Sequence, residues 1–364
     1  MGAAEAEGSR GSERTPILGE VTAVAPIRVC DLGGWTDTWF SRRGTVFNIA
    51  VSPGVEVRVR ILEAGSIRHR IVLEVANFGD TYGFEPGHAP GRHPLLEAVI
   101  DDVGVPDGVA VKIRVASDVP AGSSTGTSAA VAVALIGALD ALVRPRPPLE
   151  VAQAAHRVEV ERLGLQSGVQ DQLSAAFGGV SFIEVGPYPQ ASRTGLSVPE
   201  PALQELGQRL VLLHLGRPHR SSEIHDRVIE RLVGEGEDSP ALEELRACAV
   251  MARDAALAGD LEAVGRAMTR NTDAQRRLHA DLVSAQAQAA IDIAAAHGAS
   301  GWKVNGAGGE GGSLSLLAGP DPARRHTMER ALLAADASLR VIPTCLSQVG
   351  MQVRRSTPPG AAAS

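Results

Sequence analysis

The segment that most constrains this chain of 364 residues is Val119–Leu139, where a loop of small residues runs into an apolar helix. The loop is rich in Gly, Ser and Thr, and the junction with the helix carries no acidic residue. Small residues let backbone N–H groups approach a ligand closely, and a helix start adds free donors and the positive end of the helix dipole. The segment therefore predicts an anion site, most often for phosphate, although an ordinary loop capped by Ser or Thr has a similar composition.

The composition argues against several classes of partner. The net charge is −7, aromatic residues make up 3%, and no lysine-rich or arginine-rich run occurs, so nucleic acid is not an expected partner. No stretch is long and apolar enough to span a membrane, so we expect no membrane partner. The scattered Cys30, Cys248 and Cys345 form neither a metal-ligand pattern nor a disulfide framework, which favours a cytoplasmic location. We expect a monomer or a homodimer.

The pattern along the chain predicts an α+β protein, with a mixed N-terminal half and a helix-rich C-terminal half. By composition, residues 1–16 are expected to be a disordered leader and 357–364 a disordered tail. A Pro/Ser/Gly-rich stretch at 186–208 predicts the boundary between two lobes, 17–195 and 196–356. Helices are expected over 95–103, 127–143, 149–163, 222–233, 240–258, 261–278, 282–297 and 323–335.

Two common phosphate-binding classes do not fit. A Walker loop needs Gly-Lys followed by Ser or Thr, and neither of the two lysines, Lys112 and Lys303, follows a glycine. The run Gly306–Gly311 matches G-x-G-x-x-G, but Ser313–Gly319 after it is strand-like, whereas a Rossmann fingerprint must open a helix. This run therefore predicts a glycine turn between two strands.

Three segments, in order, resemble the motifs of the GHMP kinases: Ala25–Thr38, Pro120–Ala130 and Lys303–Ala318. The resemblance implies a two-lobed fold, with an N-terminal α/β lobe like ribosomal protein S5 and a ferredoxin-like α+β C-terminal lobe. It also implies ATP and Mg²⁺ as cofactors. The chain departs from the family pattern at Ser124 and Thr125, where Gly and Leu are usual, and within the third motif at Glu310 and Ser313.

The resemblance places the triphosphate and Mg²⁺ on the second motif. Ser128 and Glu159 are the implied Mg²⁺ ligands, with Glu161 as the alternative to Glu159. One Ser and one Glu suffice because Mg²⁺ keeps waters and phosphate oxygens; the other interpretation is a solvated helix end with two glutamates. The implied ATP-binding residues are Pro120, Gly122, Ser123, Ser124, Thr125, Gly126, Thr127 and Ser128.

Two residues are the implied catalytic pair. Asp171 occupies the place of the family's catalytic Asp, where it would accept the proton of the attacking hydroxyl or orient that hydroxyl. Without the resemblance, the pattern at Asp171 favours a helix N-cap, a common place for Asp. Arg28 is the implied partner of Asp171 and would stabilise developing negative charge; the alternative is a surface arginine on a strand.

The first and third motifs are expected to bind the acceptor. Asp37 resembles the Asp that binds sugar hydroxyls, and one carboxylate can accept two hydrogen bonds. Gly34 and Trp35 replace the Glu-His of galactokinases, which favours the subgroup of fucose, arabinose and heptose-7-phosphate kinases. Arg220 could hold a distal phosphate, or could be an exposed residue at a helix start. Thr36, Gly306 and Gly308 complete the expected substrate-binding residues, and Asn271 and Gln275 could line the pocket.

The resemblance therefore implies a sugar kinase that uses ATP and phosphorylates the anomeric C1 hydroxyl of a small-molecule sugar. The expected acceptor is a heptose 7-phosphate-like or longer-chain sugar phosphate, giving a sugar 1-phosphate for nucleotide-sugar biosynthesis. A fucose- or arabinose-type 1-kinase on an unphosphorylated sugar, and a non-catalytic sugar/ATP sensor, remain the alternatives.

Overall fold

The computed structural model describes residues 17–89, 91–217 and 223–357, and the predicted α+β class is confirmed. Two long antiparallel strands, β1 (Ile17–Leu32) and β2 (Gly44–Glu63), form the centre of an N-terminal sheet. Over much of their length, buried and more open residues alternate, which is the pattern of a sheet with one covered face.

The N-terminal sheet runs in the order β13, β1, β2, β5, β3, β4, while β6, β7 and β12 extend it from β2. The β3–β5 pair is parallel and the other pairs between named strands of this sheet are antiparallel. The remaining elements of this layer are β3 (Ile71–Val75), η1 (Ala76–Phe78), β4 (Asp80–Phe84), β5 (Val109–Ser117), β6 (Val180–Val185), β7 (Ala191–Gly195), β12 (Cys345–Leu346) and β13 (Gln352–Ser356).

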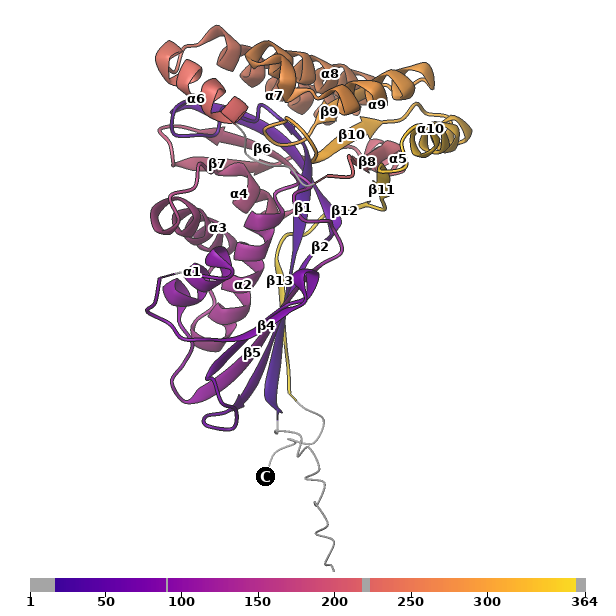
Figure 1. Ribbon diagram of the computed structural model, residues 1–364. Helices are drawn as coiled ribbons and strands as arrows, with labels where there is room; N and C mark the ends of the chain where they lie inside the picture. Colours follow the sequence, from indigo (N-terminus) through magenta and orange to yellow (C-terminus); the bar gives the residue numbers. More distant parts are fainter. Residues whose placement is uncertain (1–16, 90, 218–222, 358–364) are drawn as a thin grey trace, which may run out of the picture.

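Helices α1 to α4 cover one face of this sheet (Figure 1). Helix α2 is apolar nearly all round and its middle is fully buried, as its sequence predicts. The opposite face of β2 and β5 carries exposed charged residues, including Arg60, Lys112 and Arg114, and stays open. The helices are α1 (Pro94–Val103), α2 (Thr127–Val143), α3 (Pro148–Arg157), the π-helical turn η2 (Val158–Arg162) and α4 (Gln170–Phe177).

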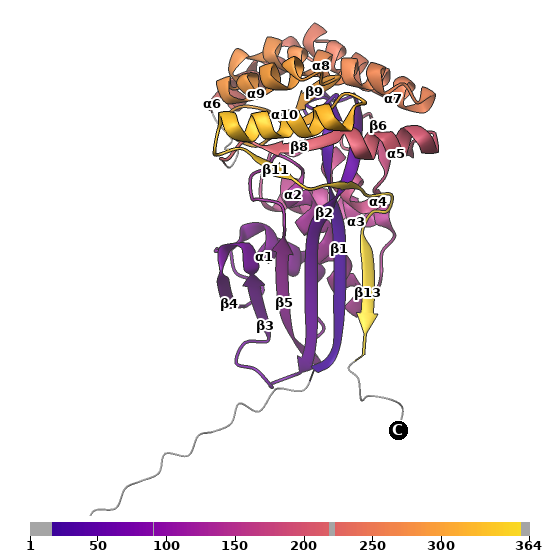
Figure 2. The ribbon, with the colours of Figure 1, turned by 90° about the vertical axis from the view of Figure 1, so that its right-hand side faces the viewer.

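The C-terminal part is an antiparallel sheet in the order β11, β8, β10, β9, with helices packed around it. Apolar residues of β8 and β10 form a core with α9 and α10 on one face, and Leu210 and Leu212 join the main core on the other. Figure 2 shows this part above the N-terminal sheet, with α10 in front of β8. Its elements are α5 (Glu200–Arg209), β8 (Leu210–His214), α6 (Glu223–Glu235), α7 (Pro240–Ala258), α8 (Leu261–Leu278), η3 (Ala280–Leu282), α9 (Ala285–Ala296), β9 (Gly301–Val304), β10 (Ser313–Leu317), α10 (Pro322–Ala335) and β11 (Arg340–Ile342).

The stretch 186–208 holds β7 of the N-terminal sheet and most of α5, two elements that its Pro/Ser/Gly-rich composition does not predict. The end of the predicted C-terminal lobe, 196–356, returns to the N-terminal sheet, where β12 pairs with β2 and β13 with β1. These short segments become strands because they pair with strands that are distant in the sequence, and local composition gives no sign of such pairing. The leader 1–16 and residues 358–364 lie outside the described residues.

Within the described ranges, no single helix is long and apolar enough to cross a membrane. The segments Thr127–Val143 and Pro148–Arg162 pass that test only when taken together, and the chain turns by 118° between them.

Candidate active site

The phosphate loop keeps the geometry of an anion site. Gly126 precedes α2 with φ 69°, no side chain caps the helix start, and its first turn holds no acidic residue. Backbone donors at the start of α2 therefore have no side-chain acceptor, as the anion-site prediction requires. Gly122 and Ser124 also take left-handed conformations, with φ of 73° and 57°. Ser124 thus adopts a left-handed backbone conformation that glycine takes more readily than other residues.

The third motif braces this loop from the C-terminal lobe. Ser313 Oγ donates to the Ser123 carbonyl at 2.6 Å, and Ser123 Oγ donates to the Pro120 carbonyl at 2.6 Å. A Cβ added at Gly306 would lie 3.0 Å from Ser124 Cβ, so the glycine turn packs closely on the loop. The predicted strand–turn–strand arrangement of this motif is confirmed, with the turn between β9 and β10.

Arg28 joins the phosphate loop to Asp171. Its guanidinium binds the Asp171 carboxylate through Nε–Oδ1 (2.8 Å) and Nη2–Oδ2 (3.1 Å), and also donates to the Ser124 carbonyl. The Arg28 backbone N–H donates to the Thr125 carbonyl at 3.0 Å. Burial opposes the charged guanidinium, but the carboxylates of Asp171, Asp31 and Asp37 together outweigh it and raise the pKa of Arg28. Arg28 is therefore a buried, fully charged partner and not a surface arginine.

Asp171 lies in the first turn of α4, where Val169 and not Asp171 occupies the N-cap position. The capping interpretation is therefore wrong. A Cβ added at Gly126 would lie 3.1 Å from Asp171 Cγ and 3.3 Å from Arg28 Cγ, so the pair contacts the start of α2. The Asp171 side chain is 26% exposed and can meet a ligand at the phosphate loop.

Glu159 faces the interior and Glu161 faces solvent. Glu159 Oε2 accepts hydrogen bonds from Ser167 Oγ (2.6 Å) and Gln172 Nε2 (2.8 Å). Its other oxygen, Oε1, is buried and has no hydrogen-bond partner among the described residues. Burial, with a smaller contribution from the Asp171 charge, raises the pKa of Glu159 to about 7. A buried carboxylate oxygen without a donor is the kind of ligand that fits a hard cation such as Mg²⁺.

Ser128 is exposed in the first turn of α2, directly after the phosphate loop. Among the described residues, no group of three or more His, Cys, Asp or Glu side chains could hold a metal. A Mg²⁺ ion here would therefore depend on few protein ligands together with phosphate oxygens and water, as the sequence predicts.

Asp37 is buried, and its carboxylate accepts hydrogen bonds from Gln170 at the start of α4. Asp37 Oδ2 accepts the Gln170 backbone N–H at 3.1 Å and Oδ1 accepts Gln170 Nε2 at 3.4 Å. Burial first, and the Asp171 charge second, raise the pKa of Asp37 to about 6. Asp37 is 2% exposed, so its predicted contact with a sugar hydroxyl stays a prediction.

The neighbours of Asp37 also pack into the fold. Trp35 is 8% exposed and lies near the rings of Phe40 and His225, with centroids 6.4 and 5.9 Å away. Thr36 is fully buried and donates to the Gly33 carbonyl, while Gly34 packs against Asp31. The sugar-binding roles predicted for Gly34, Trp35 and Thr36 therefore also stay predictions.

Side chains of the C-terminal lobe contact the loops of the first and third motifs. Asn271 Oδ1 accepts the Gly33 N–H at 2.8 Å, and Gln275 Nε2 donates to the Gly306 carbonyl at 2.9 Å. His225 Nε2 lies 3.2 Å from the Gly308 carbonyl oxygen. Asn271 and Gln275 thus hold the loops that border the site. Arg220, the predicted distal-phosphate ligand, lies outside the described residues.

Sequence reasoning missed an apolar pocket of about 230 Å³ beside the phosphate loop. Residues from several elements form it, so no local pattern reveals it. A flat apolar ring attached to a phosphate chain on the loop would fit here. Its lining includes Phe78, His93, Val115, Ala121, Thr127 and Val131.

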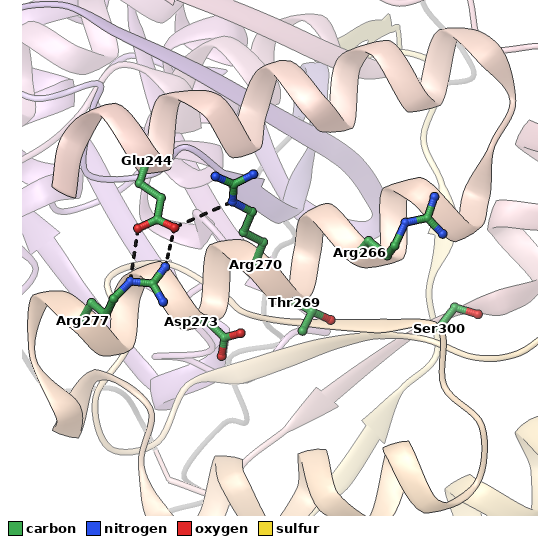
Figure 3. A pocket seen from close by; sticks show the side chains of 7 residues that line it. All are labelled: Glu244, Arg266, Thr269, Arg270, Asp273, Arg277 and Ser300. Atoms are coloured by element: carbon green, nitrogen blue, oxygen red, sulfur yellow. Dashed lines mark hydrogen bonds and ion pairs between the residues drawn. The ribbon is translucent and has the colours of Figure 1, made fainter. Parts of the chain in front are cut away.

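A second hollow, of about 370 Å³, lies on the outer side of α7 and α8 (Figure 3). Its charged side chains form ion pairs: Glu244 pairs with Arg277 at 2.5 Å and with Arg270 at 3.7 Å, while Arg266 and Asp273 pair with residues outside the hollow. This hollow contains none of the predicted site residues.

Comparison with known proteins identifies two domains in the chain. Residues 94–179 match the GHMP kinases N terminal domain and residues 252–335 match the GHMP kinases C terminal. The chain therefore carries both the N-terminal and the C-terminal domain of the GHMP kinases, as its three motifs predict.

The relatives include sugar kinases. D-glycero-alpha-D-manno-heptose 7-phosphate kinase of Campylobacter jejuni is 25% identical over 59% of this chain and 63% of that protein. The bifunctional fucokinase/GDP-fucose pyrophosphorylase of Arabidopsis thaliana is 26% identical over 82% of this chain and 30% of that protein. The chain thus spans less than two thirds of these relatives.

The fold has close structural neighbours. A crystal structure described as a D-glycero-D-manno-heptose 1-phosphate kinase from Bacteroides thetaiotaomicron matches with a TM-score of 0.70 at 24% identity. The match covers 92% of this chain and 98% of that chain, and it shows a shared fold.

Proposed function

We propose that this chain is an ATP-dependent sugar kinase that phosphorylates the anomeric C1 hydroxyl of a heptose 7-phosphate-like or longer-chain sugar phosphate. The observation that carries the proposal is the Arg28–Asp171 pair, which contacts the uncapped start of α2 at Gly126. A group that can orient a hydroxyl and take its proton thus lies beside a cradle for phosphate, as phosphoryl transfer requires.

In the proposed reaction, Asp171 accepts the proton of the C1 hydroxyl as the oxygen attacks the terminal phosphorus of ATP. The bond from that phosphorus to the bridging oxygen breaks, and ADP leaves. Arg28 holds the Asp171 carboxylate in one orientation and adds positive charge beside the forming phosphate ester. The backbone donors at the start of α2 orient the phosphate chain.

Glu159 and Ser128 would hold Mg²⁺, which neutralises phosphate charge when bound. The apolar pocket beside Thr127 and Val131 would take the base of the nucleotide, because it adjoins the loop that takes the phosphates. Ser128, Thr127 and Val131 lie on α2 directly after the phosphate loop, and the Asp171 charge acts on Glu159.

ADP release measured over a panel of heptoses, octoses and their phosphates tests the proposal. Turnover that requires a free anomeric hydroxyl supports it, and absence of turnover with every sugar contradicts it. The product, a sugar 1-phosphate, would serve nucleotide-sugar biosynthesis.

A fucose- or arabinose-type 1-kinase remains the second candidate, because a fucokinase is among the relatives that cover most of the chain. Arg220→Ala separates the two. If the acceptor already carries a phosphate, the variant raises KM for the phosphorylated sugar and leaves KM for an unphosphorylated one unchanged. An unchanged KM for the phosphorylated sugar would exclude the distal-phosphate role of Arg220.

A further inference from the structure

Lys303 and Asp31 form a buried ion pair that the proposed reaction does not use. Lys303 Nζ lies 3.3 Å from Asp31 Oδ1, and the two side chains are 0% and 1% exposed. Lys303 also donates to Gln275 Oε1 at 3.0 Å and to the Val304 carbonyl. Removing two charges from water offsets much of their mutual attraction, so stability alone does not account for such a pair.

A bulge in β1 places Asp31 near Arg28. Val29 pairs with Ile49 and Leu32 with Phe47, so β1 carries one extra residue at this point, and Cys30 has φ 54°. An extra residue resets the alternation of side chains, which returns Asp31 to the face of the strand that carries Arg28. The Asp31 charge accordingly acts on the Arg28 guanidinium.

Arg28 therefore has more than one carboxylate competing for it. Asp171, Asp31 and Asp37 all act electrostatically on its guanidinium. Asp171 holds the guanidinium through two hydrogen bonds. The negative charge of Asp31 is instead balanced by Lys303, and the Gly306 N–H donates to the Asp31 carboxylate, 3.1 Å from Oδ1 and 3.0 Å from Oδ2. Without Lys303, the buried Asp31 carboxylate would still have the Arg28 guanidinium as a nearby cation.

We propose that Lys303 is a positioning residue: by pairing with Asp31, it leaves Arg28 free to hold Asp171 in the orientation that phosphoryl transfer needs. The inference rests on the proposed kinase activity. Lys303 comes from β9, Asp31 and Arg28 from β1, and Asp171 from α4, so the C-terminal lobe sets the geometry of a pair in the N-terminal lobe.

The test compares Lys303→Met, Asp31→Asn and the double variant, with Lys112→Met as the control, because Lys112 is the other lysine and is exposed on β5. Steady-state kinetics should show that Lys303→Met lowers kcat by about tenfold or more while KM for ATP changes by less than about threefold. Asp31→Asn and the double variant should keep kcat within about threefold of the wild type, because the competing carboxylate is gone. Lys112→Met should match the wild type.

A purely structural pair gives a different pattern. It would lower Tm in Lys303→Met while the folded enzyme kept kcat within about twofold of the wild type, and this result would overturn the inference. A double variant as slow as Lys303→Met would overturn it too. If Lys303→Met does not fold, the double variant decides: near-wild-type kcat supports the inference and a loss of about tenfold or more overturns it. If the wild type turns over no sugar, the proposed function itself fails, and that outcome is visible before any variant is compared.

Discussion

Arg28 and Asp171 meet through two parallel hydrogen bonds, from Nε to Oδ1 at 2.8 Å and from Nη2 to Oδ2 at 3.1 Å. The pair joins the end of β1 to the first turn of α4 across 143 residues of sequence. Only the planar fork of an arginine makes this contact with a carboxylate, so it fixes orientation as well as charge. Because Arg28 also donates to the Ser124 carbonyl, one side chain ties the proposed base to the phosphate loop.

The first prediction concerns Asp171→Asn. The amide keeps the size of the side chain but cannot take a proton, so kcat should fall by about 10²–10⁴-fold while the affinity for ATP stays nearly unchanged. ADP release and calorimetric titration with ATP measure the two quantities. Asp107→Asn, at an exposed position, serves as the control. A variant that keeps most of its turnover would show that Asp171 is not the base, and a preserved response to sugar without turnover in the wild type would indicate a sensor.

The second prediction concerns Gly126→Ala. Gly126 has φ 69°, and an added Cβ would lie 3.1 Å from Asp171 Cγ. The left-handed backbone should cost about 1 kcal/mol of unfolding free energy, and the contact should displace Asp171 enough to lower kcat/KM by roughly tenfold. Urea unfolding and steady-state kinetics measure the two effects. Gly108→Ala is the control, because its Cβ would meet open space. Equal effects of the two substitutions would contradict the close contact.

Much of the framework follows from the sequence because it depends on local signals. The bounds expected for α2, α7 and α8 match the structure because local signals mark their ends: a proline-rich run follows the apolar α2, and Gly259 and Asp260 separate α7 from α8. Helix α5 was missed because prolines precede and begin it within a Pro/Ser/Gly-rich stretch. Strand β7 exists through its pairing with β6, which no local pattern encodes.

The candidate site, too, contains residues that the sequence predicts and residues that it does not. Motif order places Asp171, Arg28 and the phosphate loop, and the structure brings these residues together. The Asp31–Lys303 pair could not be predicted, because its partners are far apart in the sequence and a β-bulge brings Asp31 to the correct face. One signal was present: Lys303 is one of two lysines in the chain and begins the third motif.

The third prediction concerns the apolar pocket beside the phosphate loop. Val131 lines it one turn after Thr127, so Val131→Phe should fill part of its volume of about 230 Å³. KM for ATP should rise by about tenfold while KM for the sugar stays unchanged, because the loss is confined to nucleotide binding. Val143→Phe, at an exposed position near the end of the same helix, is the matched control. An unchanged KM for ATP in folded Val131→Phe would show that the nucleotide base binds elsewhere.

The fourth prediction concerns the pH dependence of stability and Asp37. Burial and the Asp171 charge raise the pKa of Asp37 from 3.8 to about 6, so the folded state prefers the protonated carboxyl. The contribution of the protonated Asp37 to the unfolding free energy is therefore fully present below about pH 4 and is lost as the pH rises through about 6. Asp37→Asn does not titrate and can still accept the Gln170 N–H. Relative to Asp37→Asn, the wild type should lose unfolding free energy of the order of 2 kcal/mol between pH 4 and 8. Urea unfolding of both proteins at several pH values measures this difference. A difference that is constant with pH, or that favours the wild type as the pH rises, would show that Asp37 is ionised at ordinary cost and is more accessible to solvent or sugar than its burial indicates.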